Sequence, residues 1–154
     1  MVTDLFGALL EELGHCLKIP NLHPDSNNSC LIRFKNGVEV QMEIDKSGRN
    51  LVVGSDLGSV PIGKYRENLF REALKANDLP PPHHGILSYS EKTDHLVLYK
   101  KIPLADLNGE KIAAAITPFS EKALIWQEAL KHNDIPAVGQ TAGQYSGGMF
   151  GLRP

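Results

Sequence analysis

The residues best suited to chemistry are histidines in the second half of the chain. His83 and His84 are adjacent, and Asp94 and His95 follow shortly after. Imidazole and carboxylate groups are common zinc ligands. However, two adjacent side chains on an irregular segment diverge, and no second His or Cys stands at the spacing that metal sites use. We therefore expect a polar loop beside prolines and no metal centre.

Two other motifs could indicate an enzyme, and both are weak. His15 and Cys16 are neighbours in a helical pattern, but adjacent helical side chains point about 100° apart and cannot form a nucleophile and its base. Gly54 and Gly58 are spaced like a phosphate loop but lack its Gly-Lys-Ser/Thr ending. The sequence therefore predicts no catalytic residues and no cofactor, which favours a binding protein over an enzyme.

Composition excludes several classes of protein. The chain has 154 residues, a length typical of one domain, and a net charge of −2. Its basic residues are scattered and do not alternate with aromatic ones, so we expect no nucleic-acid binding. No apolar run reaches the ~18 residues that a membrane span requires. Acidic residues interrupt the first segment, so we expect no signal peptide and a cytosolic protein.

The two cysteines, Cys16 and Cys30, both lie in apolar surroundings in the sequence. Thiols in such surroundings are more often small buried hydrophobic groups than members of a disulfide or a zinc pair. We therefore predict that both are buried and act as small hydrophobic groups.

Apolar periodicity predicts an α+β fold with the order α-β-β-β-α-β-β-α. Steps of three and four residues predict helices, and the strict alternation after residue 38 predicts a strand. Thr117 and Pro118 are expected to cap and start a separate second half of the last helical region. The predicted helices are 2–17, 62–76, 106–116 and 119–131, and the predicted strands are 30–34, 38–44, 50–55, 86–89 and 96–102.

The first hairpin has a predictable register. A two-residue turn at Asn36-Gly37 would place Phe34 opposite Glu39 and mix apolar and polar side chains on one face. A three-residue loop places Phe34 opposite Val38 instead. Because the hydrophobic pattern fixes register, we predict the longer loop, with Gly37 in a left-handed conformation.

A nine-residue sequence occurs twice, as EALKANDLP at 72–80 and EALKHNDIP at 128–136. Each copy follows a predicted helix, with a lysine in the last turn, an asparagine able to adopt a left-handed conformation, and a proline that prevents continuation. We interpret the repeat as a helix stop signal used twice. An ancient duplication is the alternative. Beyond 135 the chain becomes rich in glycine, and we predict one domain over 1–135 and a mobile tail over 136–154.

This order of elements gives a twisted, mostly antiparallel five-stranded sheet with helices packed on it. Three helices could cover one face, so the other face or an edge needs protection by a partner. The pattern therefore favours a dimer or a protein that holds extended polypeptide.

At this point the chain resembles class I type III secretion chaperones of the Tir-chaperone (CesT-like) family. The resemblance covers about residues 2–133, and it rests on the order and spacing of several short motifs. These are Leu13-Gly14 to Ile19-Pro20, the hairpin Cys30–Phe34 with Val38–Ile44, Leu74–Asn77 followed by Gly85-Ile86-Leu87, Leu96–Tyr99, and Pro103–Leu107 leading to Phe119, Ala123 and Trp126.

The resemblance implies a homodimer in the bacterial cytoplasm without enzymatic activity. Such chaperones are virulence-associated proteins that bind the N-terminal segment of a secreted effector in extended form and keep it competent for export. The secretion-apparatus ATPase is a further partner that the resemblance suggests. A structurally similar adaptor that binds folded partners outside secretion is the alternative. An adaptor would bind only intact folded proteins, whereas a chaperone would hold a protease-resistant N-terminal fragment.

The resemblance also suggests where partners bind. We expect apolar effector-binding pockets on the first helix and the adjoining sheet, although most of these residues would be core in any α+β domain. They are Phe6, Leu10, Leu13, Leu17, Ile32, Phe34, Val40 and Met42. The second helix and the following strand are expected to form the dimer contact, with a monomeric core as the competing explanation. Those residues are Leu69, Phe70, Ala73, Leu74, Ile86 and Leu87.

Overall fold

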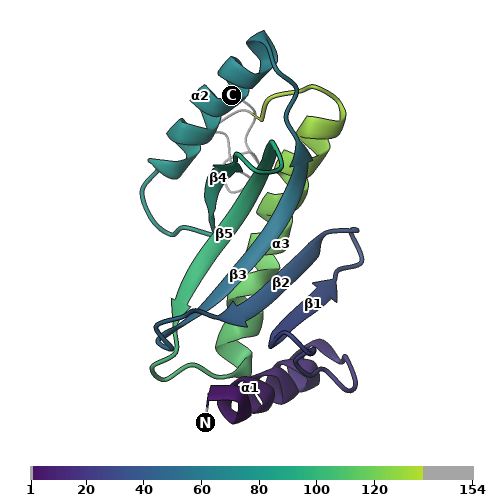
Figure 1. The fold of residues 1–154 in the computed structure, drawn as a ribbon, viewed down its shortest axis with the longest axis vertical. Helices are drawn as coiled ribbons and strands as arrows, with labels where there is room; N and C mark the ends of the chain where they lie inside the picture. Colours follow the sequence, from purple (N-terminus) through teal and green to yellow (C-terminus); the bar gives the residue numbers. More distant parts are fainter. Residues whose placement is uncertain (1, 137–154) are drawn as a thin grey trace, which may run out of the picture.

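The computed structural model describes residues 2–136, and the elements follow the predicted order (Figure 1). Residues 137–154, which carry most of the predicted tail, lie outside the described residues. The helices are α1 (Val2–Leu17), α2 (Lys64–Asn77) and α3 (Gly109–Lys131). The strands are β1 (Ser29–Arg33), β2 (Glu39–Ile44), β3 (Asn50–Ser59), β4 (Ile86–Ser90) and β5 (His95–Pro103).

The five strands form one sheet in the order β1-β2-β3-β5-β4, and every neighbouring pair is antiparallel. The predicted hairpin register is confirmed, because Ile32 pairs with Val40 and the Phe34 N–H donates to the Val38 carbonyl at 2.8 Å. Gly37 has a φ of 91°, as the three-residue loop requires. β3 continues beyond the predicted 50–55 and contains a bulge between Asp56 and Gly58.

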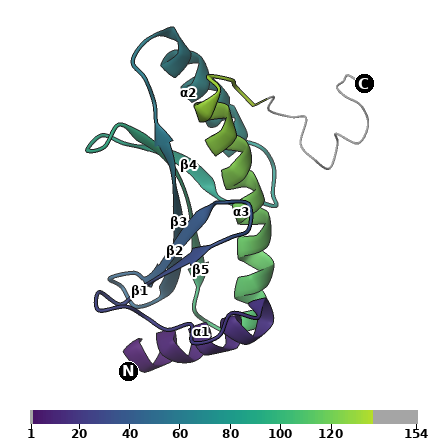
Figure 2. The same ribbon diagram turned by 90° about the vertical axis from the view of Figure 1, so that its right-hand side faces the viewer.

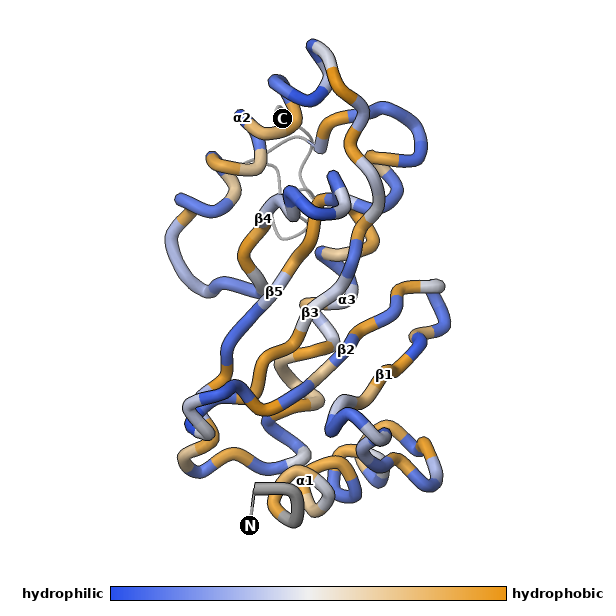
Figure 3. Tube along the Cα trace, viewed as in Figure 1, coloured by the Kyte–Doolittle hydropathy of each residue, from blue (hydrophilic) through white to orange (hydrophobic). Residues whose placement is uncertain are grey.

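α3 covers one face of the sheet, and the other two helices pack at its ends (Figure 2). α3 runs along that face, α1 crosses its lower end, and α2 lies beside β4. Apolar positions of β1, β2, β3 and β5 point toward α1 and α3, and the tube in Figure 3 shows these alternating stretches. The largest fully buried side chains are Phe6, Leu10, Leu13, Val38, Met42, Leu51, Leu69, Leu96, Leu98, Ile112, Ile116 and Phe119.

Two features at the start of α3 position this helix against α1. The side chain of Asn108 caps α3 by accepting from the Lys111 N–H at 2.9 Å. Next to it, Gly109 donates its N–H to Oε1 of Glu12 on α1 at 2.8 Å. A Cβ at Gly109 would lie only 2.5 Å from Glu12, so the close approach of α1 and α3 depends on this glycine.

The prediction of separate helices 106–116 and 119–131 is wrong, because α3 is continuous and Pro118 lies inside it. Proline provides no N–H for the preceding turn. The Thr117 hydroxyl donates to the Ala113 carbonyl at 2.9 Å, and Ser120 donates to the Thr117 carbonyl at 2.8 Å. Buried side chains continue on one face through the proline, from Ile112 to Trp126. Their burial outweighs the ~3 kcal/mol that an internal proline costs.

The repeated sequence does end two helices, as predicted, but its two asparagines differ. Lys75 and Lys131 lie in the last turns and pair with Glu72 and Glu128, each at 3.2 Å. Asn133 has a φ of 54°, which confirms the left-handed stop at the end of α3. Asn77 instead stays in the last turn of α2, and its side chain bonds to β4.

Candidate functional site

The strand β1 forms one edge of the sheet, and part of its backbone faces away from β2. In an antiparallel pair, hydrogen-bonded and non-hydrogen-bonded residues alternate. The bond from Phe34 to Val38 places Ile32 among the residues that bond to β2. It follows that the N–H and C=O groups of Leu31 and Arg33 point outward.

Only one end of this edge is closed by the chain itself. The carboxylate of Asp25 accepts from the Ser29 N–H at 3.0 Å, and the Asp25 N–H donates to the Ser29 carbonyl at 2.7 Å. Within residues 2–136, no comparable bond occupies the outward backbone groups of Leu31 or Arg33. These four polar groups can pair with an added strand.

The opposite edge, β4, is covered differently. Nδ2 of Asn77 donates to the Leu87 carbonyl at 2.9 Å, and Oδ1 accepts from the Leu87 N–H at 2.9 Å. α2 runs beside the strand, with the rings of Phe70 and Tyr89 5.1 Å apart. Arg66 binds the Tyr89 hydroxyl at 3.2 Å and also contacts Asp94 at 3.9 Å. The β1 edge is therefore the more open of the two.

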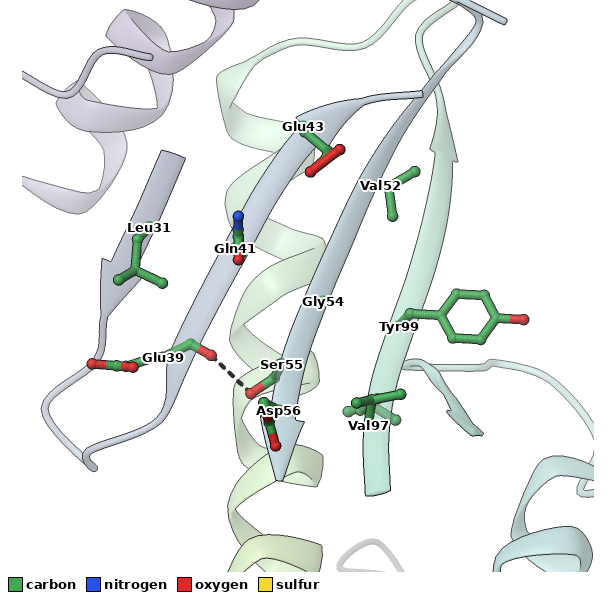
Figure 4. A pocket seen from close by; sticks show the side chains of 11 residues that line it. Leu31, Glu39, Gln41, Glu43, Val52, Gly54, Ser55, Asp56, Val97 and Tyr99 are labelled. Atoms are coloured by element: carbon green, nitrogen blue, oxygen red, sulfur yellow. Dashed lines mark hydrogen bonds between the residues drawn. The ribbon is translucent and has the colours of Figure 1, made fainter. Parts of the chain in front are cut away.

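The sheet face opposite α1 and α3 carries a hollow of about 390 Å³ (Figure 4). Strand register aligns one row of residues across it, from Leu31 through Gln41 and Gly54 to Tyr99. Gly54 has no side chain, so the floor stays low between Gln41 and Tyr99. The full lining is Leu31, Glu39, Gln41, Glu43, Val52, Gly54, Ser55, Asp56, Val97, Leu98 and Tyr99.

Most of the predicted effector-binding residues are buried by the chain itself. They split into two groups by accessibility. Leu17 and Phe34 are partly buried at the border of the core, and Phe34 directly follows β1. The other six are at most 4% exposed: Phe6, Leu10, Leu13, Ile32, Val40 and Met42. That any of the eight contacts an effector stays a prediction, and in this structure only Leu17 and Phe34 are open to such a contact.

The predicted dimer residues also divide. Leu69, Ala73 and Leu87 are buried within the chain, and Phe70 and Ile86 are half-buried. Leu74, by contrast, is 69% exposed on the outer side of α2. The structure brings α2 and β4 side by side, as the prediction requires, and the dimer contact itself stays a prediction.

The histidine group does not gather around one point. Nε2 of His83 bonds to the Leu79 carbonyl at 2.7 Å, whereas Nδ1 of His95 bonds to Asp56 on β3 at 2.7 Å. Burial, and then the charges of Lys100 and Lys122, lower the pKa of His84. Among residues 2–136, no three His, Cys, Asp or Glu side chains cluster as metal ligands.

The prediction for the cysteines is half right. Cys30 is buried in β1, and burial, followed by the nearby Asp25 charge, raises the pKa of its thiol. Cys16 is exposed, because it lies on the outer side of α1. Both thiols are free. In the part of the chain that the structure describes, no helix has the length and apolar character to cross a membrane.

Sequence reasoning missed the polar face of the sheet. The alternation after residue 38 already places Glu39, Gln41 and Glu43 together on the side away from the core. The signal that could have identified the hollow is Gly54 within a strand-like run, since a strand glycine often marks a close approach. The predicted effector-binding residues are all apolar, and most of them lie on the opposite face, toward the core.

The sequence matches the Tir chaperone protein (CesT) family over residues 8–127. No curated protein sequence is similar enough to count as a match.

Several solved structures share the fold. SycH, a type III secretion chaperone of Yersinia pestis solved with a stable fragment of YscM2, is 17% identical, with a TM-score of 0.61 and coverage of 79% of this chain and 98% of that one. The ExsC–ExsE complex gives 21% identity, a TM-score of 0.63 and coverage of 83% and 95%. The ExoT–SpcS complex of Pseudomonas aeruginosa gives 16% identity and a TM-score of 0.58, with coverage of 82% of this chain and 97% of that one. With the family match over most of its length and this shared fold, the chain belongs to the Tir chaperone protein (CesT) family.

Proposed function

We propose that the chain is a type III secretion chaperone that holds an extended segment of an exported protein along the edge of β1. The family match supports the chaperone role. Solved structures of the same fold are complexes, among them SycH with a fragment of YscM2 and SchA with HopA1. The N-terminal segment of a secreted effector is the proposed cargo, and the bacterial cytoplasm is the proposed location.

The open edge is the observation that carries this proposal. Leu31 and Arg33 present two successive outward N–H and C=O pairs, which is the pattern that an added strand requires. Leu31 is also 55% exposed on the open face, and Leu17 and Phe34 are partly buried at the border of the core. A bound segment would gain backbone hydrogen bonds from the edge and apolar contacts from these side chains.

Such binding is consistent with a role in keeping cargo unfolded. A segment that orders on binding typically buries ~1,000–3,000 Å² and loses ~2–5 kcal/mol to ordering. One short strand offers less area than this. A homodimer provides two edges for one segment, and we propose that the outer side of α2, with Leu74 and the half-buried Phe70, contributes to the dimer contact together with Ile86. Docking to the secretion-apparatus ATPase is a further part of the proposal.

We propose that the chain has no catalytic activity. His95 and Asp56 form a hydrogen bond, but Asp56 also accepts from the Gly58 N–H at 3.0 Å and thereby holds the β3 bulge. A structural role accounts for this pair. The chaperone is expected to act through binding alone, without cofactor or metal.

A pair of substitutions at one position tests the edge. Cargo is first identified as fragments that co-purify with the full chain from its source bacterium, and one fragment is then made and titrated. Arg33→Ala and Arg33→Pro both lose the pair between Arg33 and Glu39. Only proline also removes the outward N–H and places ring atoms there, while leaving the bonds to β2 intact.

We expect Arg33→Pro to bind the fragment at least ~10-fold more weakly than Arg33→Ala, the equivalent of ~1.4 kcal/mol. Equal affinity of the two variants would show that the β1 edge is not used.

Light scattering of the full chain should give twice the 16.9 kDa chain mass. If the full chain captures only intact folded proteins and no protease-resistant fragment, the chaperone role itself is wrong.

A further inference from the structure

The hollow on the open sheet face has a charge pattern of its own. Each of its charged lining residues is a carboxylate: Glu39, Glu43 and Asp56. Two of the six large apolar side chains that are most exposed within the described residues, Leu31 and Tyr99, flank the same hollow. Figure 4 shows Leu31 and Tyr99 on opposite sides, Glu39 and Asp56 at one end, and Glu43 at the other.

The spacing of these carboxylates matches an extended chain. Glu39, Gln41 and Glu43 stand two residues apart on β2, all on the open face. A strand rises about 3.3 Å per residue, so Glu39 and Glu43 lie about 13 Å apart along β2. Gln41, midway between them, pairs with Gly54 at the floor of the hollow. An extended segment lying along β2 would therefore place three alternate side chains next to Glu39, the hollow and Glu43 in turn.

The two acidic ends are not equivalent. Nε of Arg33 donates to Glu39 at 2.9 Å, and Asp56 bonds to His95, so neighbouring side chains partly compensate that end. Glu43 forms no ion pair with another residue in the described part of the chain. The end at Glu43 is therefore the stronger site for a cation.

We propose that this hollow selects exported segments with the extended pattern basic-x-apolar-x-basic. The apolar side chain enters between Leu31 and Tyr99 over Gly54, and Lys or Arg side chains on either side pair with Glu43 and Glu39. Because Leu31 belongs both to the hollow and to the open β1 edge, one polypeptide can occupy both. This inference rests on the proposed function, since the occupant is a segment of the exported partner.

Three synthetic peptides of matched length serve as probes for the full chain. The first, Ser-Lys-Thr-Leu-Thr-Lys-Ser, has the proposed spacing. The second has Glu in place of both Lys residues. The third, Ser-Thr-Lys-Leu-Lys-Thr-Ser, has the same composition as the first, but in an extended chain its Lys side chains point away from the side of Leu. Binding is measured by fluorescence polarisation of labelled peptides.

We expect the first peptide to bind at least ~5-fold more tightly than the third, and at least ~10-fold more tightly than the second, because like charges repel within the hollow. Equal binding of the first and third peptides would overturn the proposed spacing. Equal binding of the first and second would overturn the charge selection.

Substitutions in the hollow test whether the peptides bind there. Gly54→Leu fills the floor, where an added Cβ has only the Leu98 carbonyl oxygen within 4 Å, at 3.8 Å. The double change Glu39→Gln/Glu43→Gln removes two carboxylates without adding bulk. Its matched control is Glu91→Gln/Glu121→Gln, at exposed positions outside the hollow. We expect ~10-fold weaker binding for Gly54→Leu, ~5-fold for the first double variant, with Glu43 responsible for most, and no change for the control.

Unchanged binding in both hollow variants would overturn the proposal, and so would an equal loss in the control. If Gly54→Leu does not fold, the double variant decides. A shift from dimer to monomer in Gly54→Leu would assign the hollow to a second copy of the chain and also overturn the proposal. If the variants keep full affinity for a cargo fragment, the hollow is excluded while the chaperone function stands. If the unaltered chain binds no fragment, it is the function that fails.

Discussion

Asn77 binds both backbone groups of Leu87, donating to its carbonyl and accepting from its N–H, each at 2.9 Å. The side-chain amide thus acts as a short additional strand on the outer edge of β4. It connects the last turn of α2 to the sheet and occupies groups that would otherwise be free for strand addition. Asn133, at the same place in the second copy of the repeat, has a φ of 54° and ends α3 through its backbone.

The two asparagines should therefore respond differently to glycine. Asn77→Gly loses two hydrogen bonds at a partly buried edge, and we expect the free energy of unfolding to fall by about 2 kcal/mol. Asn133→Gly keeps the left-handed conformation at no steric cost, so a change within a few tenths, about 0.3 kcal/mol, is expected. Urea denaturation of both variants measures the difference. A similar loss in both would mean that the repeat has the same role in both places.

A pair of glycines in the helices gives a second prediction. Gly7 in α1 has open space around an added Cβ, so Gly7→Ala should stabilise the chain by about 0.5–1 kcal/mol through helix propensity. Gly109 at the start of α3 has Glu12 at 2.5 Å, so Gly109→Ala should destabilise it by about 1–3 kcal/mol through overpacking. Thermal denaturation monitored by circular dichroism gives both values. Stabilisation by Gly109→Ala would contradict the observed approach of α1 and α3.

The turn between β2 and β3 predicts a dependence on pH. Hydrogen bonds from the side chains of Asn50 and Ser47 lower the pKa of Asp45 from 3.8 to about 2. A carboxyl whose pKa is lower in the folded state stabilises that state above its unfolded pKa, and the contribution is lost as pH falls through the folded value. The loss should therefore occur between pH 3.8 and about 2.

Carbon-13 NMR of the Asp45 carboxyl checks the pKa directly. Asn50→Ala removes the first cause and should raise this pKa toward 3.8. Between those two pH values, unfolding free energy should fall more steeply for the unaltered chain than for Asp45→Asn. Parallel curves for the two proteins would show that the turn does not contribute in this way.

The Gly-rich tail gives a fourth prediction. A chain that ends at Pro136 should keep its melting temperature within about 2 °C of the full chain, since a stretch with few large apolar residues buries little surface. Scanning calorimetry of the two proteins makes the comparison. A large decrease would show that residues 137–154 pack against the domain.

The elements and the first register were predictable because they depend on local periodicity. Val38, Val40 and Met42 alternate with polar residues, and a shift of one residue would expose all three. The hairpin at Gly37 follows from the same constraint. The spacing of apolar residues in the helices predicted the correct boundaries for α1 and nearly correct ones for α2.

What the sequence did not predict depends on contacts between distant residues. The continuity of α3 through Pro118 comes from packing of both halves on one sheet, and this outweighs the local preference. The bond from Asn77 to Leu87 requires that α2 lie beside β4, which periodicity cannot show. The hollow depends on the cross-strand row from Gln41 to Tyr99, whose members are far apart in the sequence.

Exchange of backbone amides in the presence of cargo tests the central claim most directly. In the free chain the outward N–H groups of Leu31 and Arg33 should exchange rapidly, whereas those of Cys30 and Ile32, which bond to β2, should already be protected. With a saturating cargo fragment, NMR-detected hydrogen exchange should show new protection at Leu31 and Arg33. If a bound fragment leaves both amides in rapid exchange, the segment does not pair with β1 and the account is contradicted.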